Sequence, residues 1–175
     1  MCNDDKIFLD EHKMFQIDFS NAIWATDKLR EIFRVVYNNI LSDVDFVAED
    51  DDKIFFIEYK NPSIRSKGVE KFKVLDEEIC DKIAHKYYDS LNFIRSIRKI
   101  KKPKVYIYLL ESRLSDKNTG KEIRNRIKKR LPFKLGQQSE LFGITLKESM
   151  IDYFDVLNVK QWNEQYKQFP AKILK

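Results

Sequence analysis

The chain has few of the residues that mark specialised protein classes. Its 175 residues include two cysteines, two histidines, four glycines and four prolines. Cys2 and Cys80 are too few and too far apart for a disulfide framework or a zinc site, and Cys80 is expected to pack as a small apolar residue on a helix. The low glycine and proline content argues against a fibrous or low-complexity protein. We therefore expect one compact domain spanning residues 1–175.

Long apolar runs are also missing. No segment is long enough to cross a bilayer, and the first residues lack a basic region followed by an apolar one. We therefore expect a cytoplasmic protein that does not bind membranes. His12 and His85 have no Cys or His partner at ligand spacing, so each is expected to have a surface or packing role.

Acidic and basic residues are distributed unevenly along the chain. Residues 1–58 contain 14 acidic and 6 basic side chains, whereas residues 59–175 contain 14 acidic and 27 basic ones. Basic residues cluster at 95–104 and 121–134. Such clusters suit a polyanion such as nucleic acid, although a solvated helix surface explains either cluster alone equally well.

Hydrophobic periodicity predicts a mixture of strands and helices. The predicted strands are 14–20, 44–49, 53–60, 105–111 and 140–146, and the predicted helices are 26–41, 72–99 and 121–131. Two of the strands, 53–60 and 105–111, are apolar on both faces, which is typical of strands inside a sheet. This order predicts an α/β or α+β fold in which helices flank both faces of a mixed β-sheet.

The C-terminal segment, residues 150–169, is rich in aromatic residues. It is predicted to form short helices or a packing arm beside a core at residues 26–146. Trp162, Tyr166 and Phe169 recur at nearly helical spacing and are expected in the core or in a dimer contact. A homodimer with twofold symmetry and a monomer both remain open.

Charged residues interrupt an apolar strand in the stretch DFVAEDDDKIFFIEYKNP, residues 45–62. Strand alternation places Glu58 and Lys60 on one face. If residues 51–52 form a two-residue turn, with the acidic residues there solvated, Asp45 lies opposite Glu58. Two opposed carboxylates repel each other unless they share a cation.

All-oxygen ligands of this kind select Mg²⁺ or Mn²⁺. Lys60 can then orient an attacking water or stabilise charge on a phosphate. A register slip of two residues would replace Asp45 by Asp43, which lies outside the predicted strand. An ion pair between Glu58 and Lys60 on an edge strand is the simplest structural alternative, but apolar residues on both faces argue against an edge.

The chain has Asp45, twelve intervening residues and then Glu58-Tyr59-Lys60, on a hairpin between a helix and a helix-connected strand. This pattern, within residues 26–131, resembles the PD-(D/E)xK nuclease superfamily, which has the restriction-endonuclease-like fold. The resemblance implies that Asp45, Glu58 and the Tyr59 backbone carbonyl bind Mg²⁺ or Mn²⁺. It also implies that Lys60 assists the hydrolytic water, so Asp45, Glu58 and Lys60 are the expected catalytic residues.

Many members of the superfamily take a further metal ligand from the first helix, and Glu31 is the candidate here. On a helical wheel Glu31 lies opposite the apolar stripe, which favours solvent exposure.

These residues favour a metal-dependent nuclease that hydrolyses phosphodiester bonds of nucleic acid, with DNA as the expected substrate. The alternative is a catalytically inactive nuclease-fold protein that acts as a nucleic-acid-binding or assembly subunit. The presence of all three motif residues favours an active enzyme.

Overall fold

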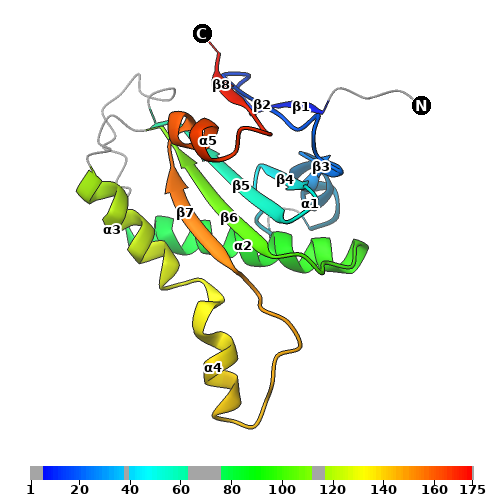
Figure 1. The fold of residues 1–175 in the computed structure, drawn as a ribbon, viewed down its shortest axis with the longest axis vertical. Coiled ribbons are helices and arrows are strands. Elements are labelled where there is room, and N and C mark those ends of the chain that lie inside the picture. Colours follow the sequence, from blue (N-terminus) through cyan, green and yellow to red (C-terminus); the bar gives the residue numbers. More distant parts are fainter. Residues whose placement is uncertain (1–5, 38–39, 63–75, 112–116, 175) are drawn as a thin grey trace.

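The computed structural model describes residues 6–37, 40–62, 76–111 and 117–174, whose strands form two sheets (Figure 1). The larger sheet has the order β3-β4-β5-β6-β7, and the smaller one has the order β1-β2-β8. The strands are β1 (Ile7–Leu9), β2 (Phe15–Asp18), β3 (Trp24–Thr26), β4 (Phe46–Glu49), β5 (Ile54–Lys60), β6 (Lys104–Leu110), β7 (Tyr153–Leu157) and β8 (Ala171–Ile173). The predicted mixed sheet is confirmed, because β3, β4 and β5 pair antiparallel whereas β5, β6 and β7 pair parallel.

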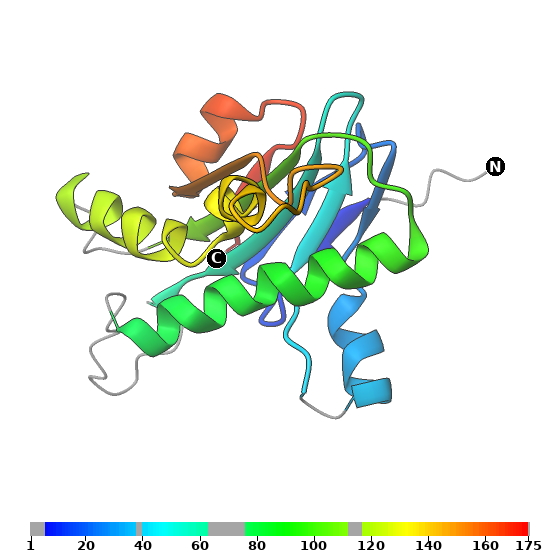
Figure 2. The same cartoon turned by 90° about the horizontal axis from the view of Figure 1, so that it is seen from below.

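The larger sheet lies between two different layers. Helices α1 (Leu29–Tyr37), α2 (Glu77–Ile97) and α3 (Lys117–Lys128) pack on one face, and Figure 2 shows α2 running across the sheet. The other face is covered by the smaller sheet together with α5 (Val159–Gln165). The expectation of helices on both faces therefore holds, but strands share the second face with a single short helix.

The β4–β5 hairpin has the predicted register. Phe46 pairs with Ile57, and Glu49 pairs with Ile54. Asp45 and Glu58 are therefore the next opposed positions of the hairpin, just beyond the Phe46–Ile57 pair. The Asp50 carboxylate closes the turn by accepting the N–H groups of Asp52 and Lys53 at 2.9 and 2.7 Å. These bonds are those of a solvated Asx turn, as the acidic sequence predicts.

Strands β5 and β6 lie in the middle of the sheet. Side chains of β6 are buried along its whole length, and in β5 only Lys60 is not fully buried. Parallel strands need a long crossover, which α2 supplies. This helix begins after Asp76, whose side chain accepts the Glu78 N–H, and Cys80 is buried on it as predicted. The predicted start of the helix at residue 72 lies outside the described residues.

The predicted strand at residues 140–146 is wrong. Helix α4 (Leu135–Glu140) ends there, and Gly143 in the following turn has a φ of +71°. A left-handed residue of this kind breaks a strand. The last strand of the larger sheet is instead β7, in the segment expected to form short helices or an arm. Its exposed Tyr153 and buried polar Asp155 obscured the strand pattern, and Arg124 of α3 pairs with that aspartate at 3.2 Å.

Aromatic residues of the C-terminal segment belong to the core of this chain. Trp162 and Phe169 are fully buried, and both rings contact Phe55 of β5. The Trp162 Nε1–H donates to the Phe169 carbonyl at 2.6 Å. These side chains are therefore not available as a dimer surface. Within the described residues, no helix has the length and apolar character needed to span a membrane.

Candidate active site

A polar cleft of about 380 Å³ lies where β5 ends and β4 begins. Residues from α1, from α2 and from the turn after β1 complete its walls. The strand end contributes Glu58 and Lys60, the segment before β4 contributes Asp43 and Asp45, and α2 contributes Lys86. The structure thus brings the three predicted catalytic residues into one cleft.

Glu58 is buried on the side of β5 that faces α2, with 6% of its surface exposed. Lys86 lies in the middle of α2, and its Nζ donates to both Glu58 carboxylate oxygens at 2.8 and 2.9 Å. Burial and the nearby Asp45 raise the pKa of Glu58 to about 8, although Lys86 opposes the shift. Burial alone would lower the pKa of Lys86, but the Glu58 and Asp45 charges outweigh it and raise that pKa.

Asp45 is held by the backbone of the neighbouring strand. Its Oδ2 accepts the Tyr59 N–H at 2.8 Å, and burial raises the pKa of its carboxyl group despite the opposing charge of Lys86. The N–H and C=O groups of one strand residue point to the same edge. The Tyr59 carbonyl, which is the predicted backbone ligand, therefore points to the edge that Asp45 occupies.

Helix α2 also positions the segment that carries the aspartates. The Ser90 hydroxyl oxygen accepts the Val44 N–H at 3.0 Å, and the Asp89 carboxylate accepts the Ser42 N–H at 2.9 Å. These bonds fix the chain on both sides of Asp43, a half-buried residue whose carboxyl pKa is raised by burial. Asp43 is thus a member of the cleft beside Asp45, not its replacement.

Lys60 is half-buried and shares the cleft with Glu58, as strand alternation predicts. Its carbonyl accepts the Glu111 N–H at 2.9 Å, which ties the end of β5 to β6. On the opposite face of β5, the Tyr59 ring stacks on Phe15 at 3.9 Å between centroids. Contacts with both neighbouring strands rule out the edge-strand alternative for the pair of charged residues.

Glu31 lies apart from Glu58. Its exposed side chain accepts a hydrogen bond from Lys28 at 3.0 Å. It lines a neighbouring hollow of about 230 Å³ that also contains Asp43 and Asp45. The structure therefore places Glu31 near Asp43 and Asp45, in a hollow that Glu58 does not line.

Several cleft residues were not predicted. Lys86 is the clearest case. The sequence signal that could have found it is the position of this lysine between Ile83 and Ser90, on the buried stripe of a helix. Arg30 and Arg34 of α1 also line the cleft. His12, expected to have a surface or packing role, lines it as well. Their positions depend on how α1 and the β1–β2 turn pack, which local sequence patterns do not report.

The donor set fits a hard divalent cation. Within the described ranges, no three His, Cys, Asp or Glu side chains are close enough to hold a metal by themselves. A metal here would use the Asp45 and Glu58 carboxylates, the Tyr59 carbonyl, water and substrate oxygens, which is a typical Mg²⁺ arrangement. The Lys86 ammonium group supplies a positive charge to the same Glu58 oxygens.

Comparisons with protein families, with curated proteins and with solved structures find no match for this chain.

Proposed function

We propose that the protein is a metal-dependent nuclease that hydrolyses phosphodiester bonds of nucleic acid, with DNA as the expected substrate and Mg²⁺ or Mn²⁺ as cofactor. The observation that carries this proposal is the meeting of Asp45 and Glu58 across the β4–β5 hairpin, beside Lys60, in a polar cleft. Burying two carboxylates close together is costly, and a bound divalent cation would offset that cost.

The roles of the residues follow from their positions. Asp45, Glu58 and the Tyr59 carbonyl would hold the metal, which when bound polarises the phosphate and lowers the pKa of a coordinated water. Lys60 lines the same cleft and would orient that water or stabilise charge on the phosphate. Arg34, on the α1 wall, would bind a neighbouring phosphate, whereas Arg30 is paired with Glu11 and would have to leave that ion pair to do so. The water oxygen bonds to phosphorus while the ester bond to the leaving sugar oxygen breaks, giving a phosphate monoester and a hydroxyl group.

A second candidate is a nuclease-fold subunit that binds nucleic acid without turnover. The hydrogen bonds from Lys86 to both Glu58 oxygens favour it, because they neutralise the carboxylate without a metal. In an active enzyme Lys86 would have to move aside, or share Glu58 with the metal.

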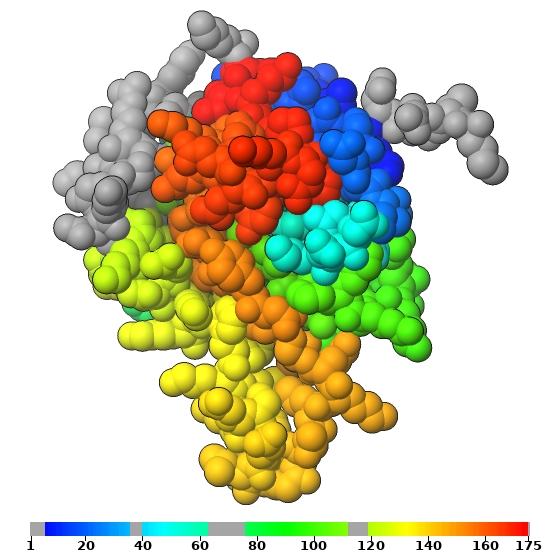
Figure 3. Space-filling model, in the orientation of Figure 1, coloured from blue at the N-terminus to red at the C-terminus, as the bar shows by residue number. Residues whose placement is uncertain are grey.

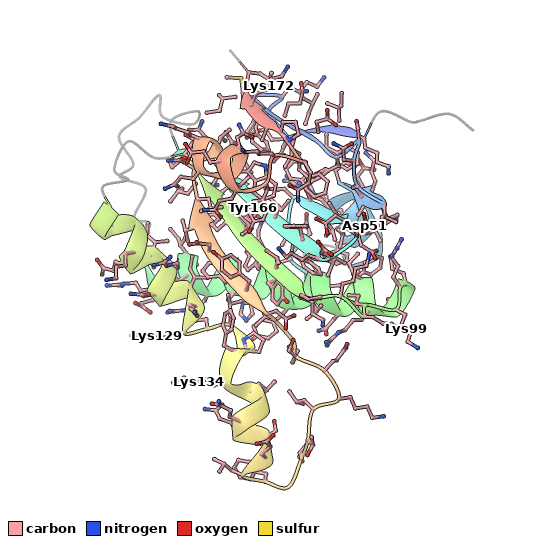
Figure 4. The ribbon with its side chains drawn as sticks, in the orientation of Figure 1. Asp51, Lys99, Lys129, Lys134, Tyr166 and Lys172 are labelled. Atoms are coloured by element: carbon pink, nitrogen blue, oxygen red, sulfur yellow. The ribbon has the colours of Figure 1, made fainter. Side chains whose placement is uncertain are left out.

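Cleavage of supercoiled plasmid, single-stranded DNA and RNA in Mg²⁺ or Mn²⁺ tests the proposal. Asp45→Asn and Lys60→Ala should each reduce the cleavage rate at least about a hundredfold, because general acid–base and electrostatic groups contribute on this scale. Asp51→Asn is the matched control, since Asp51 is an exposed acidic residue of the hairpin turn (Figure 4), and it should stay within about twofold of the wild type.

Cleavage that persists unchanged in Asp45→Asn and Lys60→Ala would sink the nuclease assignment. Salt-sensitive DNA binding with no cleavage in either metal would instead support the binding subunit.

A further inference from the structure

Residues 132–149, here called the arm, project from the body of the protein between α3 and β7 (Figures 1 and 3). Both ends of the arm are anchored to α2. The Tyr88 hydroxyl donates to the Arg130 carbonyl at 3.0 Å, and the Tyr87 hydroxyl donates to the Met150 carbonyl at 2.6 Å. The arm is therefore held in a defined direction.

The tip of the arm is an ordered helix end. The Gly143 N–H donates to the Glu140 carbonyl and the Ile144 N–H donates to the Ser139 carbonyl, both at 3.0 Å. This pair of bonds, with Gly143 at positive φ, is a Schellman motif. In a Schellman motif the residue after the glycine, here Ile144, commonly packs on an apolar residue four positions before the glycine, which here is Ser139. Because Ser139 is polar, Ile144 has no apolar partner there.

Three apolar side chains consequently face solvent at the tip. Leu141 is 82% exposed, Phe142 is 81% exposed and Ile144 is 58% exposed. Neighbouring apolar residues exposed to this degree mark a contact surface.

The root of the arm is basic. A groove of about 600 Å³ lies there, and its lining includes Lys128, Lys129, Lys134 and Phe133. Arg130 is neutralised by Glu77 and Asp81, but the described residues form no ion pair with Lys129 or Lys134. Figure 4 shows both lysines at this root. Their charge is available for an anionic partner.

We propose that the arm is a nucleic-acid docking element, in which the root lysines contact phosphates and Phe142 and Leu141 contact bases. The proposal rests on the proposed function only in taking nucleic acid as the ligand. Basic residues at the root and an exposed aromatic at the tip, at opposite ends of α4, match the two parts of a nucleic-acid strand, because phosphates bind lysine and every base can stack on a ring. An apolar protein partner or a second copy of the chain would use the tip but has no need of the root charges.

Anisotropy of fluorescent single-stranded and duplex DNA, measured in EDTA over a range of salt, tests the arm. The Lys129→Glu/Lys134→Glu variant should weaken binding at least tenfold and reduce the slope of log affinity against log salt by about two. Phe142→Ser should weaken binding several-fold with an unchanged slope. Lys160→Glu/Lys172→Glu is the control matched in charge, because both lysines are exposed and distant in sequence from the arm.

Equal DNA affinity in the root variant and the matched control would overturn the proposal. A second result would also overturn the proposal. In it, Phe142→Ser binds DNA as the wild type does, but it loses either self-association in sedimentation or binding to anionic lipid vesicles. The tip would then serve a protein or membrane contact.

The arm and the cleft can be tested separately, because no residue lines both. Hydrolysis of the small diester thymidine 5′-p-nitrophenyl phosphate reports the cleft alone. If that activity is present, the arm variants should retain it and Asp45→Asn should lose it. If the arm proposal is wrong, the arm variants bind DNA as the control does, and the small-substrate activity can still be present. If the nuclease proposal is wrong, no small-substrate activity is found, and DNA binding by the arm can still be measured.

Discussion

At the scale of single residues, the cleft brings together charged side chains whose burial is unfavourable unless each has a partner of opposite charge. Glu58 is buried in a central strand, and Asp45 adds a second negative charge beside it. Lys86 offsets part of this cost through two hydrogen bonds. Removing one partner of a buried pair leaves an uncompensated charge, and buried charged groups with perturbed pKa values in a cleft mark a candidate functional site.

The raised pKa of Glu58, about 8, predicts that the proposed metal binding depends on pH. The metal needs the deprotonated carboxylate, so metal binding must displace a proton from most molecules at pH values well below 8. Affinity for Mg²⁺ should fall by up to about tenfold per pH unit from pH 8 to pH 6, and should level off above pH 8.

Isothermal titration calorimetry in buffers of different ionisation enthalpy measures this linkage. We expect about one proton to be released per metal at pH 7, and fewer above pH 8. An affinity that is constant from pH 6 to pH 8, without proton release, contradicts a role for Glu58 as a ligand with a raised pKa.

At the scale of secondary structure, the sequence predicted the elements that carry strong local signals. The hairpin register followed from strand alternation and an Asp-rich turn, and the position of β6 inside the sheet followed from apolar residues on both faces. These signals also located Asp45, Glu58 and Lys60 correctly on one hairpin.

Elements without such signals were missed. Strands β1, β3 and β8 have three residues each, too few to show a period. The polar and partly exposed residues of β7 hid its place beside β6. Lys86 entered the cleft through the packing of α2 on β5, a long-range contact that no local pattern contains.

The C-terminal segment stabilises the larger sheet, which predicts the effect of Trp162→Ala. Trp162 is fully buried and contacts Phe55, so truncation should lower the free energy of unfolding by about 3–5 kcal/mol. The control is Trp24→Ala, because Trp24 lies half-buried in the edge strand β3 under Arg98. Urea unfolding should show a clearly smaller loss for Trp24→Ala, and equal losses would refute the core position of the C-terminal segment.

At the scale of the whole molecule, the cleft and the arm occupy separate parts of one chain. Five of the fourteen acidic residues at 1–58 line the cleft, together with four basic residues, whereas the arm root belongs to the basic run at residues 121–134. The cleft therefore has mixed charge, whereas the arm root is basic. The sequence showed the basic run, but the direction of the arm depends on the anchors from α2, and the turn at its tip depends on Gly143.

The proposed function requires that Asp45, Glu58 and the Tyr59 carbonyl hold a metal ion. A crystal structure of the protein with Mn²⁺, recorded at a wavelength where manganese scatters anomalously, tests it directly. We expect an anomalous peak roughly 2.0–2.3 Å from oxygens of Asp45 and Glu58, by analogy with octahedral oxygen sites of Mg²⁺, with Lys86 displaced from at least one Glu58 oxygen. A fully occupied Lys86–Glu58 pair and no peak in the cleft at saturating Mn²⁺ would contradict the claim.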